Sequence, residues 1–174
     1  MRLFVAVPIS EELRGKLWDL GKEIDQDGIK RVNAANMHIT LKFLGEMPED
    51  AAEKVMGQLK EVEFSSFRCS VKGIGVFPNE NYIRVVWAGS ESNDQLEILA
   101  QKVQACLGGQ KERFSSHITI ARVKRKVDIK EFLEKHKDEE FGPLDVSEFH
   151  LMKSELKREG PEYSIIGTFG AKDA

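Results

Sequence analysis

The chain has 174 residues, of which 41% are hydrophobic and 32% charged, values typical of a folded protein with a sizeable core. The formal net charge of −3 argues against a protein that coats long nucleic acids. The apolar run at the N-terminus ends at Pro8, and no stretch approaches the ~18 apolar residues of a membrane span, so we expect a cytoplasmic protein without membrane contact. Cys69 and Cys106 stand alone, and we expect two free thiols.

Strands and amphipathic helices are predicted to alternate along the chain. An opening strand at 3–7 is followed by Ser10, a good helix N-cap, and by apolar residues at helical spacing up to Gly28. The same signals predict the other elements. In chain order these are a strand at 37–44, a helix opened by 48–50, strands at 67–77 and 82–88, a helix capped by 92–94, a strand at 116–123, a helix capped by Asp128, and strands at 146–152 and 163–169.

This order, β-α-β-α-β-β-α-β-α-β-β, predicts an α+β fold rather than regular βαβ winding. We expect a bilobal protein with two antiparallel β-sheets and flanking helices. The lobes should be related by an approximate twofold, with a groove between them. Residues 1–174 are expected to form one such two-lobed domain.

The tripeptide His-Ile-Thr occurs twice, beginning at His38 and at His117. Each copy is typical of a β-strand, in which residues i and i+2 share a face. His38 and Thr40 should therefore face one way, as should His117 and Thr119. The intervening apolar residues should face the core: Ile39, Leu41 and Phe43 in the first copy, Ile118 and Ile120 in the second.

Both motifs lie in segments that are rich in positive charge. Residues 28–45 hold Lys30, Arg31 and Lys42 and no acid, and residues 111–126 hold six basic residues and one acid, Glu112. Two locally positive segments on an acidic chain favour a small anionic group as ligand.

Two imidazoles that face each other across an anion can serve as general acid and general base in phosphodiester chemistry. A catalytic zinc site would need three protein ligands, and threonine is a poor one, so we expect no metal and no other cofactor. Threonine as nucleophile would give two nucleophiles for one site. Thr40 and Thr119 are more simply hydrogen-bond donors to phosphate oxygens.

The segments from His38 to Glu46 and from His117 to Arg122 resemble the motifs of two-histidine (2H) phosphoesterases. Within these, the chain resembles bacterial and archaeal RNA 2′,3′-cyclic phosphodiesterases, also called 2′-5′ RNA ligases. The resemblance implies metal-free hydrolysis of a ribose 2′,3′-cyclic phosphate to a 2′-phosphomonoester. It further implies His38 as proton donor and His117 as proton acceptor.

Three further residues are expected to contact substrate: Arg122, Lys42 and Tyr163. Strand parity places Arg122 on the face opposite to His117, so its contact requires a bend in the strand. The family often has an aromatic residue at the position of Arg31, and a base could stack there on the guanidinium instead.

The expected partners are RNA 3′ ends or small cyclic-phosphate nucleotides, bound by a monomer. Ligation would be a slow reversal in which a 5′-hydroxyl opens the cyclic phosphate. One alternative is a 2H hydrolase of another small cyclic or 2′-5′ phosphodiester. Another is a non-catalytic module that binds RNA ends, which would not need both histidines.

Overall fold

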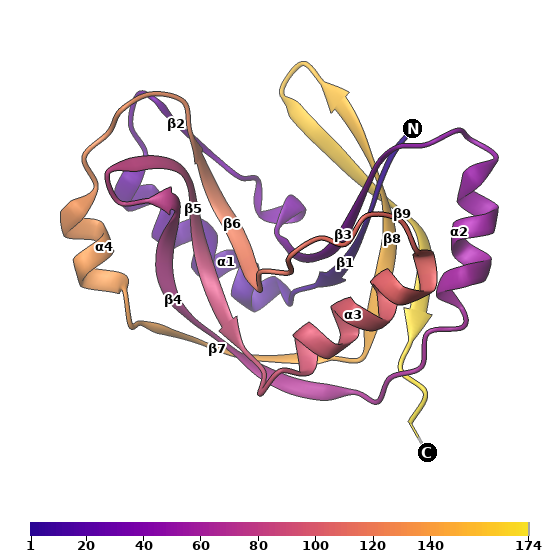
Figure 1. The fold of residues 1–174 in the computed structure, drawn as a ribbon. Helices are drawn as coiled ribbons and strands as arrows, with labels where there is room; N and C mark the ends of the chain where they lie inside the picture. The colour runs from indigo at the N-terminus through magenta and orange to yellow at the C-terminus, as the bar shows by residue number, and fades with distance from the viewer. Residues whose placement is uncertain (174) are drawn as a thin grey trace.

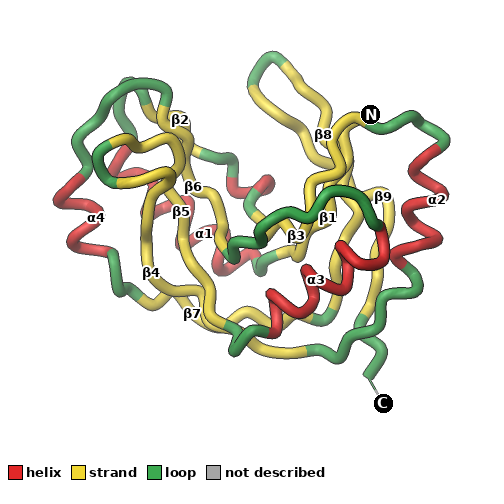
Figure 2. Tube along the Cα trace, viewed as in Figure 1, coloured by secondary structure: helices red, strands yellow, loops and turns green. Residues whose placement is uncertain are grey.

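The computed structural model describes residues 1–173, which form nine β-strands and four α-helices (Figures 1 and 2). The strands are β1 (Arg2–Pro8), β2 (Ile29–Arg31), β3 (His38–Glu46), β4 (Phe67–Asn79), β5 (Tyr82–Glu91), β6 (His117–Val123), β7 (Glu140–Val146), β8 (Glu148–Lys157) and β9 (Gly160–Gly170). The α-helices are α1 (Glu11–Gly21), α2 (Ala51–Leu59), α3 (Gln95–Leu107) and α4 (Lys130–His136), with 3₁₀ turns at Lys22–Ile24 and Ala34–Asn36. Within residues 1–173, no helix is long and apolar enough to cross a bilayer.

The strands form one curled antiparallel sheet in the order β7-β4-β5-β6-β3-β1-β8-β9, with β2 added to β6. We call β3, β1, β8 and β9 the first lobe, and β7, β4, β5, β6 and β2 the second lobe. In the described residues, the lobes meet at one registered pair, Ile39 of β3 opposite Ile118 of β6. The expected α+β fold with antiparallel sheets is confirmed, and this pair joins the two sheets into one.

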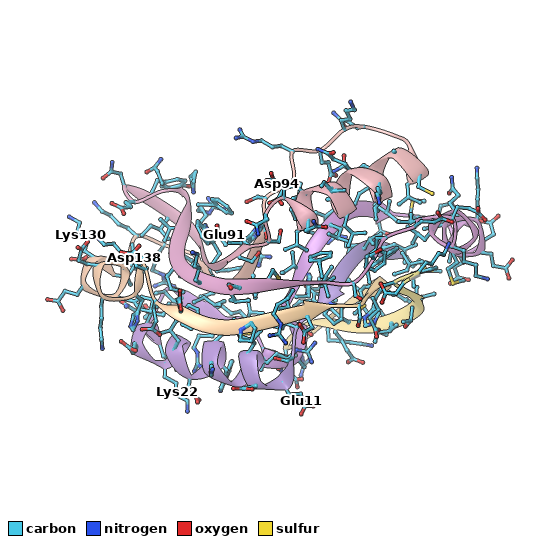
Figure 3. All side chains as sticks on the ribbon, turned by 90° about the horizontal axis from the view of Figure 1, so that it is seen from below. Glu11, Lys22, Glu91, Asp94, Lys130 and Asp138 are labelled. Atoms are coloured by element: carbon cyan, nitrogen blue, oxygen red, sulfur yellow. The ribbon has the colours of Figure 1, made fainter. Side chains whose placement is uncertain are left out.

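Helix α1 follows the first strand of the first lobe, and α3 follows β5 of the second lobe. Ser10 Oγ accepts the Leu13 amide at the start of α1 (3.2 Å), and Ser92 Oγ accepts the Leu96 amide at the start of α3 (2.9 Å). Figure 3 labels Glu11 and Lys22 near the ends of α1 and Asp94 at the start of α3, on opposite sides of the strands.

Each of these helices packs against the lobe that it does not follow. Helix α1 contacts β6 and β7, whereas α3 contacts β3 and α2. The buried leucines and valine of the two helices recur at the predicted helical spacing: Leu13, Leu17 and Leu20 in α1, and Leu96, Leu99 and Val103 in α3. The exchange of helices ties the lobes together beyond the single pair in the sheet.

Two strands were not predicted, β2 and β7. Strand β2 has three residues and forms through its pairing with β6, which is distant in sequence. Strand β7 contains Gly142 and Pro143, residues that are rare in strand interiors. Because β7 is an edge strand paired with β4 alone, it tolerates a proline.

Candidate active site

The pairing of Ile39 with Ile118 brings the two motifs together. Both isoleucines are fully buried. Because side chains alternate along antiparallel strands, the motif histidines and threonines lie on the other face of the sheet. There His38 is opposite Thr119, and Thr40 is opposite His117. We call this the motif face.

Strand β3 contains a β-bulge directly after its threonine. Its pairing with β1 is regular through Thr40, which lies opposite Ala6. Lys42 lies opposite Val5, the residue of β1 that precedes Ala6, so that Leu41 has no partner residue in β1. The extra residue reverses the alternation of side chains beyond it.

Strand β6 contains the same bulge at the same place. Thr119 lies opposite Trp87 of β5, and Ala121 lies opposite the preceding residue, Val86. Ile120 therefore has no partner residue in β5. Over the six residues that begin at each histidine, the two strands share one burial pattern, with two consecutive buried residues after the threonine. The bulges are therefore a matched pair in the two lobes.

The bulges redistribute the side chains that follow each motif. Lys42 turns to the core, where it is 6% exposed and donates to the Gln110 carbonyl (3.2 Å), so the structure does not bring it to the motif face. Phe43 turns to the motif face and is 61% exposed, so its prediction as a core residue is wrong. Arg122 also turns to the motif face, because the bulge supplies the bend that it required.

Two hydrogen bonds and two aromatic rings fix the His38 imidazole in place. Its Nδ1 lies 2.6 Å from the Asn36 carbonyl oxygen, and its Nε2 lies 2.8 Å from Thr40 Oγ1. The Phe4 ring stacks on the imidazole at 5.0 Å, and Tyr163 of β9 packs edge-on at 5.5 Å. Since a carbonyl only accepts, Nδ1 carries the hydrogen, and Nε2 of the neutral ring accepts from Thr40.

His117 is anchored in the same way. Its Nδ1 donates to the Ser115 carbonyl (2.9 Å), which again belongs to the second residue before the histidine. The Phe77 ring packs edge-on at 5.1 Å. Both imidazoles are thus fixed in one tautomer, with Nε2 as the nitrogen that can exchange a proton.

Burial lowers the pKa of the His38 imidazole to about 4, although its hydrogen bond to the Asn36 carbonyl opposes the shift. Positive charges on Arg14, His117 and Arg122 lower it further. Burial also lowers the pKa of His117, and Arg122 again adds to the shift. Among the described residues, the charges that shift these two pKa values are all cationic, so the motif face suits an anion.

Arg14 of α1 was not anticipated from the sequence, since it stands far from either motif along the chain. It is partly buried, its charge acts on His38, and its Nε has no hydrogen-bond partner among the described residues.

Arg31 does not offer a platform for a base. Its guanidinium stacks on Trp18 (3.7 Å) and donates to the Trp18 carbonyl and to Asp25 (3.4 Å).

The other two histidines, His136 and His150, are buried and bonded to carboxylates. His136 contacts Glu23 and Glu139, and His150 contacts Glu148. In the part of the chain that the structure describes, no group of three or more His, Cys, Asp or Glu side chains is arranged to hold a metal ion.

A sheet that presents two anchored His-x-Thr motifs on one face defines a phosphoesterase of the two-histidine type. The family model described as LigT like Phosphoesterase matches residues 7–87 and 89–163, and the chain belongs to this family. The predicted membership of the 2H phosphoesterases is thereby confirmed.

Relatives and solved structures match nearly the whole chain. The RNA 2′,3′-cyclic phosphodiesterase of Archaeoglobus fulgidus is 38% identical over 175 residues, covering 97% of this chain and 99% of that protein. The protein of the same name from Methanocaldococcus jannaschii is 37% identical, covering 95% and 98%. The crystal structure of TT0787 of Thermus thermophilus superposes with a TM-score of 0.82 at 32% identity, covering 98% of this chain and 97% of that one. E. coli LigT complexed with 3′-AMP shares the fold, with a TM-score of 0.83 at 22% identity over 99% and 98% of the chains.

Proposed function

We propose that the protein hydrolyses the terminal 2′,3′-cyclic phosphate of RNA to a 2′-phosphomonoester, with His38 and His117 as general acid and general base. One observation carries the proposal: the two histidines lie on the same face of one sheet, beside Thr40, Thr119 and Arg122. Each histidine is anchored through its Nδ1 to a backbone carbonyl in the segment that leads into its own strand. The substrate class is supported by the names of the relatives that match nearly the full chain.

The reaction is a displacement at phosphorus. Nε2 of neutral His117 takes a proton from water, and the hydroxide oxygen bonds to phosphorus in line with the ribose 3′-oxygen. The bond from phosphorus to the 3′-oxygen breaks, and Nε2 of protonated His38 gives that oxygen its proton. The product carries the phosphate on the 2′-oxygen, and Arg122 offsets the negative charge that develops.

The bound substrate favours the protonated form of His38, which is the form that a general acid needs. With a pKa of about 4, His38 of the free protein is neutral at neutral pH. A bound phosphate anion raises the pKa of His38, because its negative charge stabilises the imidazolium and offsets the positive charges of Arg14 and Arg122. Once Nε2 is protonated it no longer accepts from Thr40, whose hydroxyl hydrogen is then free for a phosphate oxygen.

The same groups support a slow 2′-5′ ligation. A 5′-hydroxyl in place of water would attack the cyclic phosphate, with His117 as base and His38 as acid. Since both motifs come from one chain, the site is complete in a monomer. Two free thiols suit a reducing compartment such as the cytoplasm.

The test is incubation with EDTA and a short RNA that ends in a 2′,3′-cyclic phosphate, with separation of 2′- from 3′-phosphate products. We expect 2′-phosphate alone. The variants His38→Ala and His117→Ala should each lower turnover by about 10²- to 10⁴-fold. A 3′-phosphate product would show that the 2′-oxygen leaves, and undiminished turnover in either variant would remove that histidine from the mechanism.

A further inference from the structure

The segment before the first motif is held against the strand of the second motif by backbone pairing. Strand β2 pairs with β6 at three registered positions, the last of which joins Arg31 to Ala121. Arg31 stands seven residues before His38. Its partner, Ala121, stands four residues after His117. The chain that leads into the first motif is therefore already fixed to the sheet.

The segment before the second motif, residues 108–116, contains no strand. A side chain forms the corresponding tie, because Lys42 Nζ of β3 donates to the Gln110 carbonyl (3.2 Å). Gln110 stands seven residues before His117. Lys42 stands four residues after His38. The bond thus joins the two positions that correspond, in the other half of the site, to the last backbone pair of β2 with β6.

Lys42 is buried at this place, although an amine is better solvated in water. Its side chain is 6% exposed, and no other lysine or arginine within residues 1–173 is buried. Removing a polar or charged group from water costs free energy that a single hydrogen bond returns only in part. A methionine of similar length could fill the same space without that cost. The lysine is therefore better explained by the carbonyl that it holds than by packing.

Gln104 of α3 fastens the middle of the same segment. Its side chain accepts from the Glu112 amide and donates to the Glu112 carbonyl, both at 3.1 Å. At the start of the segment, Gly108 and Gly109 have positive φ angles, and a Cβ at either would meet no atom within 4 Å. The segment thus leaves α3 through two unconstrained glycines, so its position depends on side-chain ties.

The far end of the segment sets the geometry of His117. The Ser115 carbonyl accepts from His117 Nδ1 (2.9 Å), which fixes the tautomer that leaves Nε2 free. A displacement of Ser115 would loosen the ring and let both tautomers form. His38 is anchored instead to Asn36, which follows the paired strand β2, so its geometry does not depend on Lys42.

We propose that Lys42 is a positioning residue for His117. From the strand of the first motif, its side chain holds the segment that ends in the Ser115 carbonyl. This tie takes the place of the backbone pairing that holds the segment before His38. It also couples the two motifs, since a displacement of β3 is passed on to the base of the reaction. The inference rests on the proposed function, in which His117 is that base.

Nitrogen NMR of the two imidazoles tests the tie without any substrate. At about pH 8, above the lowered pKa values of both rings, Nδ1 should carry the hydrogen and Nε2 should carry none. In Lys42→Met, the nitrogen signals of His117 should shift toward the average of the two tautomers, and those of His38 should stay in place. Unchanged His117 signals, or equal shifts in both rings, would overturn the inference.

Hydrolysis of the cyclic-phosphate RNA gives a second readout. Lys42→Met should lower kcat about tenfold and change KM less than about threefold, because the base is displaced while the phosphate contacts remain. The urea midpoint should not fall, since the substitution removes a buried polar group. A change in KM alone would overturn the inference. If the unmodified protein hydrolyses no cyclic phosphate, the proposed function fails, and the imidazole signals still decide the role of Lys42.

A second variant on α3 keeps the test decisive if Lys42→Met does not fold. Gln104→Met releases the same segment at Glu112 and should shift the His117 signals in the same direction. Lys102→Met is the matched control, because it also removes a bond from α3 to a carbonyl, that of Glu63 (2.8 Å), outside this segment. It should leave both imidazoles unchanged. An unchanged His117 in Gln104→Met, or an equal shift in Lys102→Met, would overturn the inference.

Discussion

At the scale of single residues, the protonation state of His38 determines how the rate depends on pH. Burial lowers the pKa of His38 to about 4 in the free protein, and a bound phosphate raises it. The profile of kcat/KM reports the free protein, whereas that of kcat reports the complex. As pH rises, kcat/KM should therefore begin to fall at a lower pH than kcat. Both are measured between about pH 4 and 9. Descending limbs at the same pH would show that the substrate does not shift His38.

Arg14 offers a second prediction at this scale. Its positive charge disfavours protonated His38, so Arg14→Gln should raise the pKa of His38, as followed by NMR titration of the ring. Arg68→Gln is the control, because Arg68 is exposed and paired with Asp145 (2.7 Å) and does not act on His38. A lowered or unchanged pKa in Arg14→Gln would contradict the electrostatic account.

At the scale of elements, two hydrogen bonds tie the β8–β9 hairpin to the segment before the first motif. Asn36 Nδ2 donates to the Pro161 carbonyl (2.9 Å), and Lys30 Nζ donates to the Glu159 carbonyl (3.1 Å). Asn36 also holds His38 through its own carbonyl, while β9 brings Tyr163 against the imidazole. One asparagine thus links two elements that position the ring.

Removal of this link should reduce turnover. Asn36→Ala is expected to lower kcat roughly tenfold, because His38 loses part of its fixed geometry. Lys30→Met removes the other tie of the hairpin without touching His38, and should change kcat less than about threefold. Equal losses in the two variants would mean that hairpin attachment in general, and not the position of His38, limits the rate.

The bulges also explain which site residues could be predicted from sequence. Alternation along a strand correctly placed His38 and His117 on one face, because both strands are regular up to the threonine. It failed for Phe43 and Lys42, which follow the extra residue. A bulge arises from the pairing of β3 with β1 and of β6 with β5, contacts between distant segments that no local pattern of residue types encodes. For the same reason, β2 escaped prediction, since its three residues are a strand only through β6.

At the scale of the whole molecule, His38 and His136 couple folding to pH in opposite directions. The unfolded chain binds a proton at His38 near pH 6.5, but the folded chain does so only near pH 4. Folding therefore loses stability as pH falls through this window. His136 behaves in the opposite way: burial opposes its protonation, but hydrogen bonds to Glu23 and Glu139 outweigh burial and raise its pKa. Its contribution is complete below pH 6.5 and is lost as pH rises through its folded pKa.

Unfolding free energies from urea titrations at pH 5 and pH 7.5 test both effects. Between these pH values, the loss at His38 amounts to about 2 kcal/mol, so His38→Asn should lose about that much less stability than the unmodified protein on acidification. His136→Asn should be more destabilising at pH 5 than at pH 7.5, because the charged pairs of His136 with Glu23 and Glu139 form only when the ring is protonated. The pKa of Glu23 is lowered chiefly by its hydrogen bond to His136, so the difference for His136→Asn reports the histidine together with this carboxylate, whereas the difference for His38→Asn isolates His38. Identical pH dependence in the three proteins would show that neither ring changes its pKa on folding.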